Sequence, residues 1–249
     1  MTNFTLEVCA NSATSCLNAE LGGAHRVELC ASMPEGGTTP SYGEIALARE
    51  LINIKLHVII RPRGGDFLYT DLEQRAMLRD IDMAKQLGAD GIVIGCLTPS
   101  GDVDVELCSK LIARAGGMSV TFHRAFDRCR NPHEALEAIV ALGCQRVLTS
   151  GQRATAEQGI PLLRELVTKA ANRISIMPGS GINETNIVRI ARETGAHEFH
   201  SSARHTVASA MLYRNSGISM GGEVTINEDE ISQTSVLRVK QTIQLLHNL

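Results

Sequence analysis

The sequence predicts an α/β protein with a single TIM-barrel domain, a (β/α)8 barrel, over residues 1–249. Eight short apolar segments have strand character, and each ends in a polar or glycine-rich tail. A segment with helical periodicity separates each from the next, and 249 residues is a typical length for this barrel as one domain. The eight segments with their tails lie at residues 6–9, 27–30, 58–65, 92–96, 120–124, 147–151, 176–181 and 199–202.

The helices between these strands are predicted from their first and last residues. Thr70 with Glu73 three residues later forms a capping box, and Gly88 is expected to end the helix that it opens. Proline at a first helical position and glycine after a last one mark helix ends in the same way. Two further helices are therefore expected from Pro132 to Gly143 and from Asn183 to Gly195.

The chain changes character after the eighth strand. Residues 204–235 lack clear periodicity, and a last helix is expected over residues 236–246. Loops this long in a compact domain are usually functional or mobile. We therefore expect residues 204–235 to be a lid or partner loop after strand eight, and a merely disordered insertion is the alternative.

Composition excludes several classes of protein. A net charge of −3 offers no basic face for nucleic acid, and no apolar run is long enough to cross a membrane. The first residues lack the charged and apolar regions of a secretory signal. Seven cysteines without paired spacing argue against a disulfide framework. A cytoplasmic protein is therefore expected.

The strand ends of a barrel open onto one mouth, and alternate side chains point inward. On the first two strands this alternation places Glu7, Cys9, Glu28 and Cys30 inside, on neighbouring strands. The same alternation predicts more polar side chains inside the barrel. These are Arg61, Thr121, His123, Glu198 and His200.

The inward charges allow two interpretations. Buried ions must be paired, so they form either a structural network or a reactive site. In the reactive interpretation, Glu28, Arg61 and His123 are candidate catalytic residues for acid–base work on an anionic ligand. The structural network would join Glu7, Glu28 and Glu198 with Arg26, Arg61 and Arg124.

A glycine-rich turn at residues 178–182 follows the seventh strand. Loops after strands seven and eight often bind phosphate in such barrels, because backbone N–H groups and a helix start converge there. The alternative is that the glycines only permit a tight turn. The candidate anion-binding residues are Arg63, Gly179, Ser180, Gly181, Ser201 and Ser202.

Five segments, residues 6–9, 26–30, 61–67, 121–127 and 178–182, together resemble the copper homeostasis protein CutC family. The resemblance begins at residue 4, continues to about residue 204 and supports the (β/α)8 fold. It implies a cytoplasmic homodimer with a role in copper handling. It also implies that Cys9 and Cys30 carry Cu(I), since both family cysteines are present.

Cu(I) is soft and favours thiolates, so Cys9 and Cys30 offer two-coordinate ligation. However, the sequence has no Cys-x-x-Cys pair, methionine-rich run or histidine-rich tract. Inert packing and thiol catalysis are the alternatives for these two residues. Three functions remain open: Cu(I) binding, an enzyme acting on a small phosphorylated or anionic metabolite, and a scaffold that contacts a partner.

Overall fold

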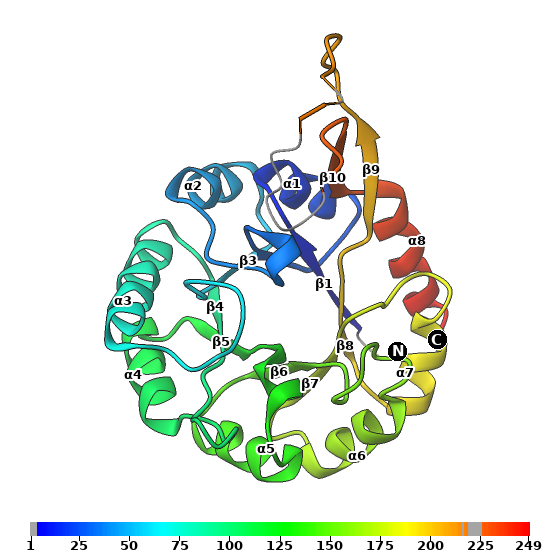
Figure 1. Cartoon of the computed structure of the whole chain (residues 1–249). Helices are drawn as coiled ribbons and strands as arrows, with labels where there is room; N and C mark the ends of the chain where they lie inside the picture. Colours follow the sequence, from blue (N-terminus) through cyan, green and yellow to red (C-terminus); the bar gives the residue numbers. More distant parts are fainter. Residues whose placement is uncertain (1–3, 216, 219–225) are drawn as a thin grey trace.

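The protein is a barrel of eight parallel strands surrounded by helices, seen along its axis in Figure 1, and the predicted fold class is confirmed. The computed structural model describes residues 4–215, 217–218 and 226–249. Each strand overlaps a predicted apolar segment, and β3 begins three residues before the predicted start at residue 58. The strands are β1 (Thr5–Ala10), β2 (Arg26–Leu29), β3 (Lys55–Ile59), β4 (Gly91–Ile94), β5 (Ser119–Phe122), β6 (Arg146–Thr149), β7 (Ser175–Pro178) and β8 (Glu198–Ser201).

The hydrogen-bonded strand order is β7-β6-β5-β4-β3-β2-β1-β8, so each strand pairs with its neighbour in sequence and β1 also pairs with β8. β7 and β8 lie side by side. Ser175 on β7 also lies close enough to Glu198 on β8 to lower its pKa. The barrel is therefore nearly closed, and all the strand ends that carry predicted site residues face one mouth.

Eight α-helices are present in the described part of the chain. The capping box predicted at Thr70 and Glu73 is present. The helix predicted from Asn183 begins at residue 187 instead, because the side chains of Asn183 and Asn186 accept backbone N–H groups and form a turn. The helices are α1 (Ala13–Leu21), α2 (Tyr42–Leu51), α3 (Asp71–Gln86), α4 (Val105–Ala115), α5 (Pro132–Ala141), α6 (Ile160–Ala170), α7 (Ile187–Thr194) and α8 (Val236–His247).

The main hydrophobic core lies between the strands and the helices. Leu6 and Val8 of β1 are fully buried in it, so the predicted outward direction of these side chains is confirmed. A separate small cluster lies inside the barrel. It consists of Cys9, Cys30, Ile59 and Val93, with Met33 packed against it.

Residues after β8 form an antiparallel hairpin that the sequence pattern did not predict. Its strands are β9 (Arg204–Ala208) and β10 (Glu230–Thr234), and α1 anchors it where Ser15 Oγ accepts the N–H of Thr234 at 3.1 Å. Figure 1 shows the hairpin running outward beside α1 and α8, beyond the ring of helices. Residues 216 and 219–225 of the predicted lid or partner loop lie outside the described residues, and the role of residues 204–235 stays a prediction.

A membrane-spanning helix would need a long apolar run. Across the residues that the structure describes, every helix is too short or too polar to span a bilayer.

Candidate functional site

The mouth of the barrel holds a cavity of about 970 Å³. Its wall comes from the carboxyl ends of the strands and the loops that follow them, so residues far apart in sequence meet here. Most of the predicted site residues line it. These are Cys9, Glu28, Cys30, Arg61, His123, Ser180, Gly181, Ser201 and Ser202.

Cys9 and Cys30 meet at the floor of this cavity. Cys9 lies opposite Glu28 in the parallel register of β1 and β2, and Cys30 follows two residues later on the same inward face. The two sulfur atoms and a carboxylate oxygen of Glu28 all lie within 4.8 Å of one another. The side chains are buried, and both cysteines are free. The predicted pairing of these thiols on adjacent strands is therefore present.

His200 on β8 links the thiols to the charged interior. Its Nδ1 lies 2.8 Å from Glu7 Oε1, and its Nε2 lies 3.5 Å from Glu28 Oε2. Burial alone would lower the pKa of His200, but hydrogen bonds with Cys9 and Glu7 and the charge of Glu28 hold it well above its ordinary value. His200 is therefore an imidazolium beside the thiols.

The surroundings shift the pKa values of the two thiols in opposite directions. A hydrogen bond from Cys30, followed by the contact with His200, lowers the pKa of Cys9 well below that of a free thiol even though burial opposes this. The same hydrogen bond and burial raise the pKa of Cys30. These surroundings favour ionisation of Cys9 over that of Cys30, whose thiol donates to the backbone oxygen of Glu28 at 3.9 Å.

Glu28 is the third member of the thiol group. Burial raises the pKa of Glu28 to about 8, and the charge of Cys9 adds to the increase, whereas His200 opposes it. The carboxyl group therefore exchanges its proton close to neutral pH.

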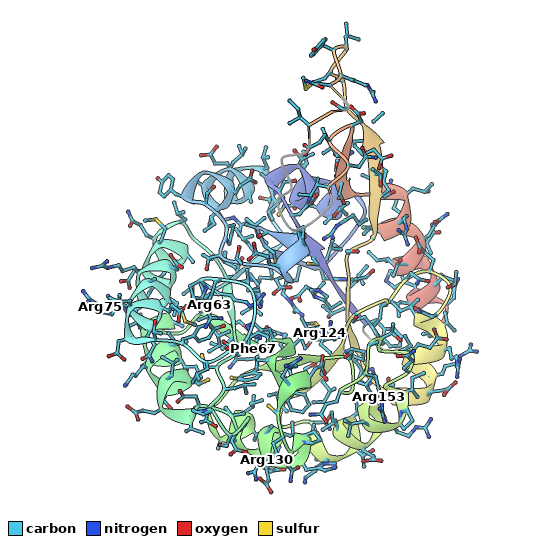
Figure 2. The ribbon with its side chains drawn as sticks, viewed as in Figure 1. Arg63, Phe67, Arg75, Arg124, Arg130 and Arg153 are labelled. Atoms are coloured by element: carbon cyan, nitrogen blue, oxygen red, sulfur yellow. The ribbon has the colours of Figure 1, made fainter. Side chains whose placement is uncertain are left out.

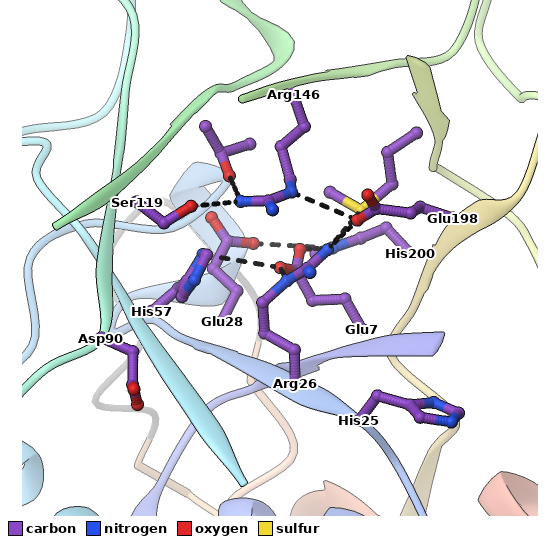
Figure 3. Close-up of polar contacts among 12 residues, drawn as sticks. Glu7, His25, Arg26, Glu28, His57, Asp90, Ser119, Arg146, Glu198 and His200 are labelled. Atoms are coloured by element: carbon purple, nitrogen blue, oxygen red, sulfur yellow. Dashed lines mark hydrogen bonds and ion pairs between the residues drawn. The ribbon is translucent and has the colours of Figure 1, made fainter. Parts of the chain in front are cut away.

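An ion-pair layer lies beneath this group, toward the amino ends of the strands (Figure 3). Arg26 pairs with Glu7 and, at 2.5 Å, with Glu198, while Arg146 Nε lies 3.2 Å from Glu198. Burial would raise the pKa of Glu7, but Arg26 and His200 hold it below its ordinary value. The predicted structural network therefore exists around Arg26, Glu7 and Glu198, with Arg146 as a member that the sequence did not identify.

Arg61 and Arg124 were predicted in the same network, and this is wrong for the described residues. Arg124 Nε pairs instead with Asp127 at 2.7 Å on its own loop. Arg61 is 5% exposed, and its guanidinium donates hydrogen bonds to three backbone carbonyl groups. Its acceptors are Glu35, Gly37 and Gly65, at 2.8 to 3.0 Å.

His123 lies at the end of β5, across the cavity wall from the thiols. Its Nδ1 accepts the backbone N–H of Ala125 at 3.1 Å, and the ring of Phe67 lies 5.1 Å from its own ring. Burial, and then the charge of Arg61, lowers the pKa of His123 to about 3. The ring is therefore neutral at physiological pH and carries its proton on Nε2.

The predicted anion-binding residues are only partly grouped. Ser180 and Ser201 line the cavity, but their hydroxyls already donate to the carbonyl groups of Ala154 and Ile182 at 2.9 and 2.7 Å. Gly181 has φ +74°, which favours glycine. A Cβ on Gly179 would lie 2.4 Å from Leu148 Cδ1, so Gly179 serves close packing.

Arg63 is not in the cavity wall. Its guanidinium pairs with Glu73 at 2.5 Å and with Asp66 at 2.9 Å, because the helix start at Thr70 places a carboxylate within its reach. Figure 2 shows Arg63 beside α3, whereas Phe67 and Arg124 lie nearer the centre of the ring. The anion-binding role predicted for Arg63 therefore has no support in this geometry.

Two important residues were absent from the predicted site. His200 was expected to point inward from the alternation on β8, but nothing local indicated its contacts with Glu7 and Cys9. Arg204 lines the cavity from the start of β9, and its Nε and Nη2 have no hydrogen-bond partner among the residues that the structure describes.

Comparisons with known proteins agree on one family. The CutC family model matches residues 4–205. A Bacteroides fragilis family protein CutC is 60% identical over 245 residues, covering 98% of both chains. A human relative named copper homeostasis protein cutC homolog is 47% identical and covers 99% of this chain and 90% of its own.

Solved structures support the same assignment. A Streptococcus agalactiae crystal structure that bears the name copper homeostasis protein CutC superposes with a TM-score of 0.77 and 37% identity, covering 80% of this chain and 98% of the other. Thiamine phosphate pyrophosphorylase from Pyrococcus furiosus, at 17% identity and a TM-score of 0.59, shares the fold alone. From the family match and the extent of these identities, the chain is a member of the CutC family.

Proposed function

We propose that this protein acts in copper homeostasis by binding Cu(I) through Cys9 and Cys30. The observation that carries the proposal is the convergence of two free thiols within 4.8 Å of each other in the cavity wall, where the surroundings also lower the pKa of Cys9. The name of the human relative, copper homeostasis protein cutC homolog, supports the same role.

The donor set fits Cu(I) better than it fits harder ions. Cu(I) accepts two thiolates in low coordination, whereas a structural zinc site needs four good ligands. Glu28 is the only further group in this cluster of described residues, and a carboxyl group with a raised pKa is a weak partner for a soft ion. Two-coordinate Cu(I) is therefore the favoured cargo.

The charge around the thiols also suits this ion. Cu(I) with two thiolates has a net charge of −1, and burying that charge without compensation is costly. The imidazolium of His200 and the guanidinium of Arg204 lie near Cys9, close enough to lower its pKa. These cations would stabilise the loaded site.

Anaerobic competition against a Cu(I) chelator tests the proposal. The Cys9→Ser, Cys30→Ser double variant should lose tight Cu(I) binding, because serine oxygens are poor ligands for a soft ion. Cys144→Ser is the matched control, since Cys144 is also buried and free but lies outside the cavity wall. The proposal fails if the double variant, with an unchanged circular dichroism spectrum, competes as well as the parent.

The enzyme hypothesis remains the alternative. Glu28, Arg61 and His123 share the cavity wall, but in the described part of the chain Glu28 has no hydrogen bond or ion pair with either of the others. Turnover of a small anionic metabolite, lost in a His123→Ala variant, would support it. Cytoplasmic location and the homodimer likewise stay predictions.

A further inference from the structure

The mouth cavity is much larger than a metal ion requires. Its volume of about 970 Å³ lies at the upper end of the range for small-molecule sites, about 300–1,000 Å³. Apolar side chains form part of its wall and suit a carbon skeleton. They include Met33, Ile59, Phe67, Leu148 and Ile182.

Within the described part of the chain, three side chains in the same wall have buried nitrogen atoms without hydrogen-bond partners. These atoms are Nε of Arg61, Nε2 of His123, and both Nε and Nη2 of Arg204. Such atoms are rare in folded proteins, because an unsatisfied buried donor costs about 1–3 kcal/mol. All of them are donors, so the group that would satisfy them is an acceptor.

The protonation of His123 strengthens this argument. Its Nδ1 is occupied as an acceptor by the N–H of Ala125 at 3.1 Å, so a neutral ring carries hydrogen on Nε2. His123 is 4% exposed, and its Nε2 is buried. Nε2 therefore offers a fixed N–H donor at the cavity wall.

The guanidinium groups that line the cavity differ in whether a carboxylate pairs with them. Arg124 and Arg238 line the same cavity, and each is paired, with Asp127 and with Glu184, both at 2.7 Å. By contrast, Arg61 and Arg204 form no ion pair with any carboxylate of the described residues. Guanidinium groups bind carboxylate and phosphate oxygens in a forked geometry.

We propose that the mouth cavity binds a small organic acid, whose carboxylate or phosphate group is held by Arg204 while Arg61 and His123 bind polar atoms across the cavity. This site goes beyond copper binding, because the groups that would hold the acid are guanidinium and imidazole groups, not the thiols. Cys9 and Cys30 form its floor, so a bound acid covers the thiols.

Isothermal titration calorimetry on the metal-free protein tests the site. The probes are succinate, inorganic phosphate and the neutral analogue succinamide, at constant ionic strength. Succinate or phosphate should bind, and the tighter of the two indicates whether a carboxylic or a phosphorylated acid is preferred, while succinamide should not bind. The absence of binding by both anions would overturn the proposal.

Variants assign the binding to Arg204. Arg204→Gln should lower the affinity for the anion by about tenfold or more, because a charge-assisted pair is lost. Arg204→Lys should retain part of the affinity. Arg75→Gln, on the outer edge of α3 in Figure 2, is the control and should bind as the parent does. Equal affinity of the Arg204→Gln variant and the parent would contradict the assignment.

Protection of Cys9 from alkylation tests whether the anion binds in this cavity. Saturating succinate or phosphate should slow alkylation of Cys9 by iodoacetamide in the parent and not in Arg204→Gln, as followed by mass spectrometry. Unchanged labelling in the parent would show that the anion binds elsewhere. The Cys9→Ser, Cys30→Ser variant should still bind the anion, so failure of copper binding and failure of this site are distinguishable.

Discussion

His200 Nδ1 lies 2.8 Å from Glu7 Oε1, which joins the charged layer inside the barrel to the thiols at its mouth. Glu7 is fully buried and also pairs with Arg26, so one carboxylate balances two cations. His200 in turn contacts Cys9 and Glu28. The protonation of the thiol site therefore depends on an ion pair deep in the barrel.

Replacing Glu7 by Gln should destabilise the protein strongly. The change leaves Arg26 and His200 buried without their shared counter-ion, and breaking a buried pair costs about 3–5 kcal/mol. Urea unfolding measures the loss. Glu106→Gln, which removes an exposed partner of Lys110, is the control and should leave the unfolding midpoint almost unchanged. A similar small effect at Glu7 would refute the structural role of this layer.

Replacing His200 by Asn should raise the pKa of Cys9. The imidazolium stabilises the thiolate, and a neutral amide stabilises it much less. The pH dependence of iodoacetamide alkylation of Cys9 should shift upward toward the behaviour of an ordinary thiol. His133→Asn on α5 lies outside the cavity wall and should leave the profile unchanged. An unshifted profile in the His200 variant would show that Cys30, and not His200, lowers the pKa of Cys9.

Replacing Glu28 by Gln should change how stability depends on pH. Because burial raises the pKa of Glu28 to about 8, above its unfolded value, the stabilising contribution of Glu28 is complete below the unfolded pKa and is lost as pH rises toward 8. Gln does not titrate, so the free energy of unfolding of the variant, relative to that of the parent, should increase from pH 5 to pH 8. Urea unfolding across this range checks the trend, and a constant difference would contradict the raised pKa.

Replacing Gly95 by Ala should displace His123. The new methyl group would lie 2.4 Å from Cε1 of the imidazole and 2.8 Å from Cβ of Ala125, and overpacking of this kind typically costs about 1–3 kcal/mol. Thermal unfolding should show the loss. Gly43→Ala on α2 has its nearest neighbour at 4.0 Å and should be neutral or slightly stabilising. Equal unfolding temperatures of the two variants would mean that His123 moves without cost.

The sequence by itself determined the barrel and the inward direction of Cys9, Glu28, Cys30 and His200. Strand alternation, helix periodicity and capping residues are local properties, and a barrel of known topology converts them directly into positions in space. The helix start at Asn183 was misplaced, because side-chain turns of Asn183 and Asn186 compete with a helical start.

Only the tertiary structure decided the partners of the long cationic side chains. Arginine reaches several acceptors from one backbone position, so Arg61 binds loop carbonyl groups and Arg63 binds Glu73, whereas Nε and Nη2 of Arg204 have no acceptor among the described residues. The hairpin of β9 and β10 likewise depends on α1, through contacts more than 200 residues apart in sequence. Pairing across such distances depends on the assembled fold, because no local pattern in the chain encodes it.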